Sequence, residues 1–183
     1  MAHVTIPNLI TLLRILLTPL FIICLIQGRY PRALAVFVLA GLTDLADGLI
    51  ARGWQQKSKL GSYLDPLADK LLLGASFVTL SIYKQIPSWL TVTVLSRDVV
   101  LTLGVLLLRL SDYNLVIRPS LAAKFTTGFQ LATVLLVLLG RVWPLPAALL
   151  RVSFGLTGVL TVASGIHYVY VGLKMVGQTG EES

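Results

Sequence analysis

The sequence predicts an all-α integral membrane protein with six transmembrane helices, and three observations favour this fold class. Hydrophobic residues make up 56% of the chain, charged residues only 13%, and the mean hydropathy is +0.85. Soluble domains carry about 25% charged residues. Six apolar segments reach about 20 residues, the length that a helix needs to cross a bilayer. The polar breaks between them are too short for a further domain, so we expect one membrane domain over residues 1–183.

The predicted spans differ in the charged residues that they carry. The first contains Arg14, and the fourth contains Arg97 beside Asp98, in surroundings that are otherwise apolar. Arg118 precedes the fifth span, and Lys124 lies near its start. The sixth contains several glycines, which permit close helix packing or a dimer contact. The predicted boundaries are residues 8–27, 32–53, 62–83, 88–110, 120–140 and 148–174.

The distribution of basic residues predicts the orientation. Six spans place both termini on one side, which carries seven basic residues against five on the other. The seven are Arg52, Lys57, Lys59, Arg109, Arg118, Lys124 and Lys174, and the five are Arg29, Arg32, Lys84, Arg141 and Arg151. The positive-inside rule therefore favours both termini in the cytoplasm. We expect the inner or cell membrane of a bacterium. The net charge of +7 is spread over the loops rather than gathered in a tail, which disfavours a nucleic-acid partner.

Half of the eight acidic residues lie at the end of the second span and the start of the third: Asp44, Asp47, Asp65 and Asp69. Spacings of three and four residues put each pair on one helix face, about 4.5 to 6 Å apart along the axis. Antiparallel neighbouring spans bring the two faces together at the cytoplasmic boundary. Four carboxylates so close repel one another unless cations lie between them, and hard oxygen ligands select Mg²⁺, Mn²⁺ or Ca²⁺. Paired ions of this kind serve phosphoryl chemistry.

Small residues and one arginine accompany the acidic pairs. Gly48, Ala51 and Gly61 leave room for a ligand close to the backbone, although tight helix packing explains glycine equally well in a membrane. Arg52 is suited to bidentate binding of a pyrophosphate. Alternatively, the Arg52 side chain extends along the apolar surface and places its charge at the membrane interface.

The acidic stretch reads Asp44-x-x-Asp47-Gly48-x-x-Ala51-Arg52, then eight residues, then Gly61-x-x-x-Asp65-x-x-x-Asp69. This pattern resembles the signature of the CDP-alcohol phosphatidyltransferases, with every signature position filled. The layout of six spans is similar to that family as well, so the resemblance covers nearly the whole chain.

The resemblance implies an enzyme that transfers a phosphatidyl group from CDP-diacylglycerol to an alcohol and releases CMP. On this chain Asp44, Asp47, Asp65 and Asp69 would bind Mg²⁺ or Mn²⁺, as two ions. Asp69 would also be the general base that accepts the proton of the acceptor hydroxyl. The residues that would line the CDP-donor site are Gly48, Ala51, Arg52 and Gly61. The resemblance also implies a homodimer.

Three basic residues are candidates for binding a phosphate on the acceptor. Arg118 and Lys124 lie one and a half turns apart at the cytoplasmic boundary, although residues at this level also serve as positive-inside anchors. Arg97 is the third candidate. Its alternatives are neutralisation by Asp98 and orientation of the metal ligands.

The sequence predicts glycerol 3-phosphate as the acceptor and leaves alternatives open. The stretch PNLITLLR at residues 7–14 and the stretch KFTT at residues 124–127 resemble the phosphatidylglycerophosphate synthase branch, whose acceptor is glycerol 3-phosphate. They are also similar to cardiolipin synthases, whose acceptor is phosphatidylglycerol, and phosphatidylinositol-phosphate synthases are a third possibility. Ala123 stands where the first branch often has glycine, a departure that bears on the branch and not on the family.

Arg14 and the acidic residues admit other interpretations. An ionisable residue inside a span is a functional hypothesis, but for Arg14 a structural counter-ion facing the acidic residues is favoured over a substrate contact. The main rival function is a divalent-cation transporter, which would distribute carboxylates along the membrane depth rather than gather them at one boundary. A structural membrane protein without chemistry leaves the four carboxylates unexplained.

Overall fold

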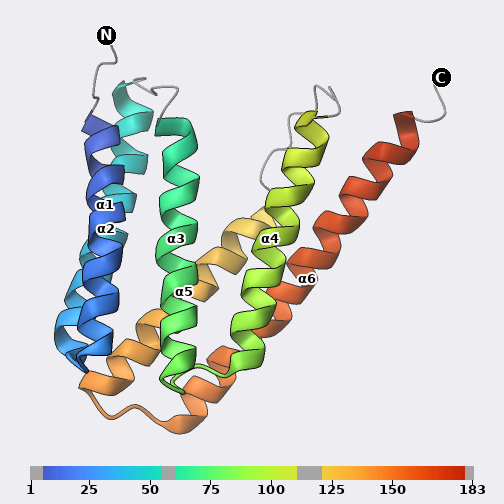
Figure 1. Cartoon of the computed structure of the whole chain (residues 1–183). Helices are drawn as coiled ribbons and strands as arrows, with labels where there is room; N and C mark the ends of the chain where they lie inside the picture. The colour runs from blue at the N-terminus through green and yellow to red at the C-terminus, as the bar shows by residue number, and fades with distance from the viewer. Residues whose placement is uncertain (1–5, 55–60, 111–120, 180–183) are drawn as a thin grey trace. The chain divides into compact units, whose positions relative to one another are not determined.

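The computed structural model of the chain describes the backbone of residues 6–54, 61–110 and 121–179, and the side chains of residues 11–43, 68–104 and 123–171. Within these residues every regular element is a helix, and there is no strand (Figure 1). The helices are α1 (Ile6–Ile26), α2 (Tyr30–Trp54), α3 (Gly61–Ile82), α4 (Ser88–Leu110), α5 (Leu121–Val142) and α6 (Ala147–Thr179). The predicted all-α class is confirmed, and each predicted span corresponds to one helix. Only α6 runs clearly past its predicted end at residue 174, because helical hydrogen bonds do not require apolar side chains.

Two helices are long and apolar enough to cross a membrane within the described part of the chain. The stretches are Ala123–Val142 in α5 and Ala147–Val171 in α6. The apolar stretches Thr11–Ile26 of α1 and Tyr30–Thr43 of α2 are shorter. Six helices are therefore confirmed, whereas six membrane crossings stay a prediction.

Contacts between helices divide the chain into two units. Unit 1 comprises residues 1–86 and 134–146, and so contains α1, α2, α3 and the end of α5. Unit 2 comprises residues 87–133 and 147–183, and so contains α4, the start of α5 and α6.

In unit 1, α1 packs against both α2 and α3. The buried face of α2 repeats at helical spacing, with Ala33, Phe37 and Ala40 all buried. Phe37 meets Phe21 of α1 in a tilted aromatic pair whose ring centroids are 5.6 Å apart. Phe77 of α3 is fully buried as well. Because α1 packs against both helices, the end of α2 and the start of α3 lie at the same end of unit 1 as the beginning of α1 (Figure 1).

Helices α1 and α3 end in the same backbone motif. After α1, Gly28 has φ = 67° and the N–H of Arg29 bonds to the carbonyl of Cys24 at 2.9 Å. After α3, Lys84 has φ = 56° and the N–H of Gln85 bonds to the carbonyl of Leu80 at 2.8 Å. This is the Schellman arrangement, in which a left-handed residue closes the last turn. Glycine usually fills that position, so the lysine is unusual.

In unit 2, α6 packs against α4 and is joined to the start of α5 by buried hydrogen bonds. Thr133 and Thr157 share a bond of 2.7 Å between their hydroxyls. Three residues earlier on α5 and four residues later on α6, the Gln130 amide donates to the Thr161 hydroxyl at 3.0 Å. Such bonds hold apolar helices together where lipid removes the hydrophobic driving force.

Candidate functional site

The four aspartates of the predicted metal site fall on two consecutive helices of unit 1. Asp44 and Asp47 belong to α2, and Asp65 and Asp69 belong to α3. Both helices pack against α1, and the chain is helical at all four positions. The predicted meeting of the two acidic pairs stays a prediction, because α2 and α3 each pack against α1 and no contact between α2 and α3 is found among the described residues.

Most side chains of this site lie outside the described residues. This applies to the metal ligands Asp44, Asp47 and Asp65 and to the donor-site residues Gly48, Ala51, Arg52 and Gly61. Among the described side chains there is no group of three residues able to hold a metal, and Asp69 is the only one of the four proposed ligands among them. The metal and donor sites stay predictions.

Asp69 is described, and it forms an ion pair with Arg14. The Arg14 Nη1 group of α1 donates to the Asp69 Oδ1 atom of α3. The side chain of Arg14 is 1% exposed, whereas that of Asp69 is 47% exposed. The predicted role of Arg14 as a counter-ion facing the acidic residues is thus supported by a direct contact.

The position of Arg14 follows from the pattern of α1. Thr11, Arg14 and Thr18 are buried at spacings of three and four, so they share the face that packs into unit 1. The same face continues with Phe21 and Leu25, both buried. The Thr18 hydroxyl donates to the Arg14 carbonyl at 3.0 Å, so this buried hydroxyl has a hydrogen-bond partner within its own helix. The buried face of α1 is therefore polar at its start, beside α3, and apolar farther along.

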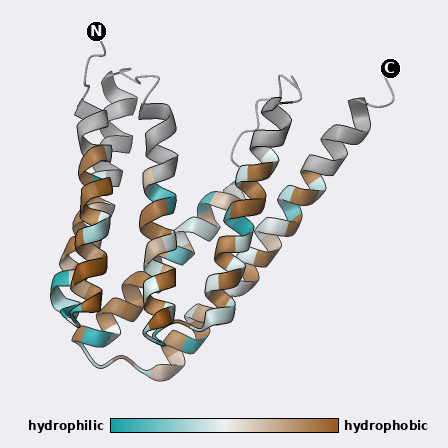
Figure 2. Ribbon diagram, in the orientation of Figure 1, coloured by the Kyte–Doolittle hydropathy of each residue, from teal (hydrophilic) through white to brown (hydrophobic). Residues whose placement is uncertain are grey.

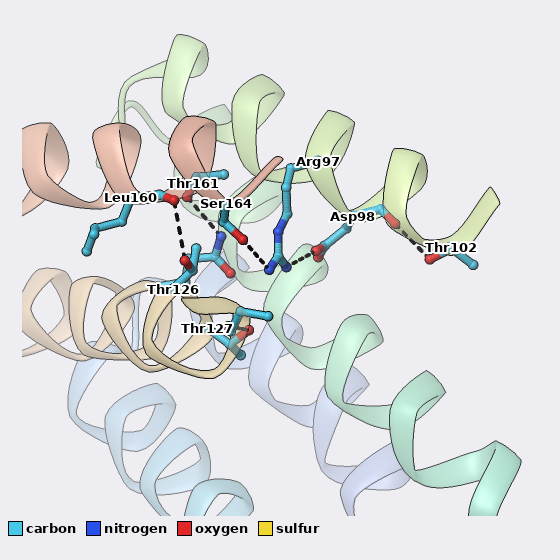
Figure 3. Close-up of polar contacts among 10 residues, drawn as sticks. Arg97, Asp98, Thr102, Thr126, Thr127, Leu160, Thr161 and Ser164 are labelled. Carbon is cyan, nitrogen blue, oxygen red and sulfur yellow. Dashed lines mark hydrogen bonds and ion pairs between the residues drawn. The ribbon is translucent and has the colours of Figure 1, made fainter. Parts of the chain in front are cut away.

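Arg97 is held inside unit 2 by a carboxylate and a hydroxyl (Figure 3). Its Nη1 group donates to Asp98 Oδ1 at 2.8 Å, and its Nη2 group donates to Ser164 Oγ at 3.1 Å. The side chain is buried, and Nε has no hydrogen-bond partner among the described residues. Neutralisation by Asp98, one of the predicted alternatives, is therefore present. A contact between Arg97 and an acceptor phosphate stays a prediction.

The other acceptor candidates are only partly described. Lys124 is exposed on α5 and has no carboxylate within ion-pair distance among the described residues. Arg118 lies outside the described residues. The hydroxyls of Thr126 and Thr127 donate to backbone carbonyls, of Leu160 at 3.3 Å and Ala123 at 3.1 Å. Thr126 thus connects α5 to α6 near Lys124, and Thr127 bonds within α5.

Three buried polar residues of α6 make contacts to which the sequence analysis assigned no role. Thr157, Thr161 and Ser164 lie on one face, where they bond to α5 and to Arg97. Their spacing of four and three in an apolar span is a signal that the sequence contains. Small hydroxyl side chains at that period indicate a polar seam between membrane helices.

Comparison with known proteins gives consistent matches. The profile of the family described as CDP-alcohol phosphatidyltransferase matches residues 4–169. The chain is 37% identical over 182 residues to the Drosophila melanogaster protein named "Probable cardiolipin synthase (CMP-forming)", covering 90% of this chain and 56% of that protein. It is 38% identical over 189 residues to the Homo sapiens "Cardiolipin synthase (CMP-forming)", covering 94% and 63%.

A bacterial protein of the second branch is similar as well. The Mycobacterium tuberculosis (strain ATCC 25618 / H37Rv) protein named "Probable phosphatidylglycerophosphate synthase" is 35% identical over 177 residues, covering 93% of this chain and 82% of that protein. The chain spans less than two thirds of the length of the two animal relatives. The identities to the cardiolipin synthases, 37% and 38%, are close to the 35% identity to the phosphatidylglycerophosphate synthase. The match to the family profile includes all of α1 to α5.

Proposed function

The chain belongs to the CDP-alcohol phosphatidyltransferase family, and from this membership we propose that it transfers a phosphatidyl group from CDP-diacylglycerol to a hydroxyl of a phosphate-bearing glycerol, releasing CMP. The observation that carries the proposal is the family match over residues 4–169, which includes the four aspartates on α2 and α3. Glycerol 3-phosphate and phosphatidylglycerol both contain the proposed acceptor unit.

We propose that Asp44, Asp47, Asp65 and Asp69 hold Mg²⁺ or Mn²⁺, as two ions. The donor set fits such ions, because carboxylate oxygens are the hard ligands that they prefer. The bound ions would supply charge neutralisation at the pyrophosphate and at the departing CMP. Arg14 is a described cation that contacts Asp69 of this acidic set.

Asp69 is the proposed general base. Its carboxylate is half exposed, so an acceptor hydroxyl can approach it, and Arg14 fixes one of its oxygens. A carboxylate held in this way can take the proton of the hydroxyl while that oxygen attacks the phosphorus of the donor. The proposed donor site consists of Gly48, Ala51, Arg52 and Gly61, where Arg52 would bind the pyrophosphate through two parallel hydrogen bonds.

Arg118 and Lys124 are proposed to bind the acceptor phosphate. The exposed Lys124 side chain supports this role, because it has no carboxylate partner among the described residues. Arg97 is a weaker candidate, since Asp98 already neutralises it. Glycerol 3-phosphate is the acceptor that the sequence predicts. Phosphatidylglycerol is the second candidate, because the two animal relatives at 37% and 38% identity are named cardiolipin synthases.

The proposed setting is a membrane, with the four aspartates at its cytoplasmic side. It is supported by the two apolar stretches in α5 and α6, and by exposed leucines at four-residue spacing on α1, namely Leu12, Leu16 and Leu20. Large exposed apolar surfaces indicate contact with lipid or another protein. A homodimer in a bacterial membrane is part of the same proposal and rests on the family resemblance alone.

Release of labelled CMP from CDP-diacylglycerol by the purified protein tests the function. Glycerol 3-phosphate, phosphatidylglycerol and inositol phosphate would be added separately in detergent with Mg²⁺ or Mn²⁺, and Asp65→Asn serves as the inactive control. Release that depends on one acceptor would establish the reaction and the branch. No release with any acceptor, together with cation flux in liposomes, would instead support the transporter.

The acceptor site has its own test. Arg118→Ala and Lys124→Ala should raise the KM for the acceptor about tenfold or more while leaving the KM for CDP-diacylglycerol unchanged, because a charge-assisted contact to phosphate contributes about 1.5 to 3 kcal/mol. Arg151→Gln is the matched control, since Arg151 is an exposed cation of unit 2 that belongs to neither the donor site nor the acceptor site. Unchanged acceptor kinetics in both alanine variants would contradict the assignment.

A further inference from the structure

We propose that one end of unit 1 binds the phosphate of an anionic phospholipid through four cations that the proposed reaction does not use. The cations are Arg29, Arg32, Lys84 and Arg141, called the basic end below. All four are exposed. They lie where α1 ends, α2 begins and α3 and α5 end. The acidic residues lie toward the other end of α2 and α3.

A network of side chains brings the parts of the basic end together. The Gln85 amide donates from Nε2 to the Tyr30 hydroxyl at 3.0 Å, and Arg141 Nε donates to Oε1 of the same amide. The Arg141 guanidinium carbon also lies 5.7 Å from the centroid of the Tyr30 ring. Since Arg29 adjoins Tyr30 and Lys84 adjoins Gln85, these contacts join the turns after α1 and α3 to the last turn of α5. Arg141 is therefore fixed in position while its side chain stays exposed, which lowers the entropy lost on binding.

Among the side chains that the structure describes, no carboxylate neutralises the basic end. None of its four cations has an ion-pair partner among the described residues. The sequence also contains no acidic residue in the segments 26–34, 80–90 and 138–146. The local excess of positive charge is therefore available to an anion from outside this part of the chain.

Helix dipoles account for only some of these cations. Lys84 and Arg141 lie at the C-terminal ends of α3 and α5, where a positive charge is favourable. Arg32 lies instead in the first turn of α2, where its N–H bonds to the Arg29 carbonyl at 3.0 Å and the dipole disfavours a cation. Lys84 has φ = 56°, a conformation that side chains other than glycine rarely adopt. Arg32 and Lys84 thus occupy positions where their residue types do not favour the stability of the helix.

The position of the basic end selects a phospholipid over other anions. Arg141 is next to the end of Ala123–Val142, a stretch long enough to cross a membrane, so it lies at headgroup level in the proposed setting. Exposed Tyr83 and Trp143 lie in the same turns, and such aromatic residues favour the membrane interface. Figure 2 shows hydrophilic residues gathered at this end of unit 1, below an apolar stretch of α1 suited to acyl chains. Guanidinium groups bind phosphate oxygens in pairs.

Binding of phosphatidylserine to the full-length protein, measured by native mass spectrometry in detergent, tests the proposal. This anionic lipid is not an acceptor in the proposed reaction, and EDTA without CDP-diacylglycerol keeps the proposed catalytic site unloaded. We expect phosphatidylserine to bind at least tenfold more tightly than zwitterionic phosphatidylcholine. Arg29→Gln with Arg32→Gln should weaken it at least tenfold, whereas Arg141→Lys, which keeps the charge, should weaken it less than Arg141→Gln.

Arg151→Gln is the matched control, because it removes an exposed cation of unit 2 and should leave binding unchanged. Equal binding of the two lipids, or unchanged binding in the folded Arg29→Gln/Arg32→Gln variant, would overturn the proposal. An equal loss in Arg151→Gln would show a nonspecific charge effect and overturn it too. Displacement of the lipid by submillimolar inorganic phosphate would show a site for free phosphate instead. CMP release should stay within twofold in the Arg29→Gln/Arg32→Gln variant, so its loss there would also count against a separate site.

Discussion

At the scale of single residues, the contact between Arg14 and Asp69 links the architecture to the proposed chemistry. A buried guanidinium is costly unless it is paired, and here the partner is the residue proposed as general base. Arg14 therefore has a reason to be buried, and Asp69 has a fixed position. Both follow from the packing of α1 against α3.

Replacement of Asp69 by asparagine should remove most of the turnover. Asparagine keeps the size of the side chain but cannot accept the proton of the acceptor hydroxyl, so kcat for CMP release should fall by roughly 10²- to 10⁴-fold. The measurement is CMP release at saturating metal and donor, with the thermal unfolding midpoint recorded to show that the variant is folded. Intact turnover under these conditions would remove Asp69 from the role of general base.

The pair itself can be measured by a double-mutant cycle. Arg14→Gln, Asp69→Asn and the double variant should show a coupling free energy of unfolding above about 0.5 kcal/mol, because the two side chains are in direct contact. Denaturation in mixed micelles provides the free energies. Arg29→Gln combined with Asp69→Asn is the control pair, which should be additive, since Arg29 has no described ion-pair partner. Additivity for Arg14 and Asp69 would mean that the contact contributes nothing to stability.

At the scale of the helices, α6 uses small and hydroxyl side chains to meet its neighbours. Thr157 and Thr161 bond to α5, and Gly158 lies between them against Trp89 of α4. Within unit 2, the threonines of α6 therefore contact α5, and its Gly158 permits the close approach of α4. The predicted role of the glycines of α6 in close helix packing is confirmed at Gly158.

Gly158→Ala should destabilise unit 2. A Cβ atom at Gly158 would lie 2.7 Å from Cζ3 of Trp89, so the indole ring must move, at a cost of about 1 to 3 kcal/mol. Gly155→Ala is the matched control, because a Cβ there meets nothing within 4 Å and alanine is the better helix former. The measurement is the thermal unfolding midpoint of each variant. Trp89→Ala should remove the penalty at Gly158, and equal midpoints for the two glycine variants would contradict the packing argument.

At the scale of the whole molecule, the four aspartates should bind stabilising divalent ions. A ligand present at 100 times its Kd stabilises the folded state by about 2.7 kcal/mol. Adding Mn²⁺ to the EDTA-treated protein should therefore raise the unfolding midpoint and restore CMP release. Asp44→Asn and Asp65→Asn should lose the shift in midpoint. A midpoint that does not respond to Mn²⁺ in the unmodified chain would exclude binding at these residues, whatever the outcome of the activity assay.

The helical class and the six helices could be predicted from the sequence, because apolar segments of fixed length are local properties. The spaced acidic signature is local as well, and it carried the resemblance to the family. The sequence also placed Arg14 as a counter-ion, since a lone arginine in an apolar span needs an anion. Sequence could not determine which anion, because helices far apart in the chain meet only after packing. Only the packed helices show that Asp69 is the partner of Arg14 and that Arg97 donates to both Asp98 and Ser164. They alone show that Gln85 and Tyr30 fix Arg141, since those contacts join three separate turns.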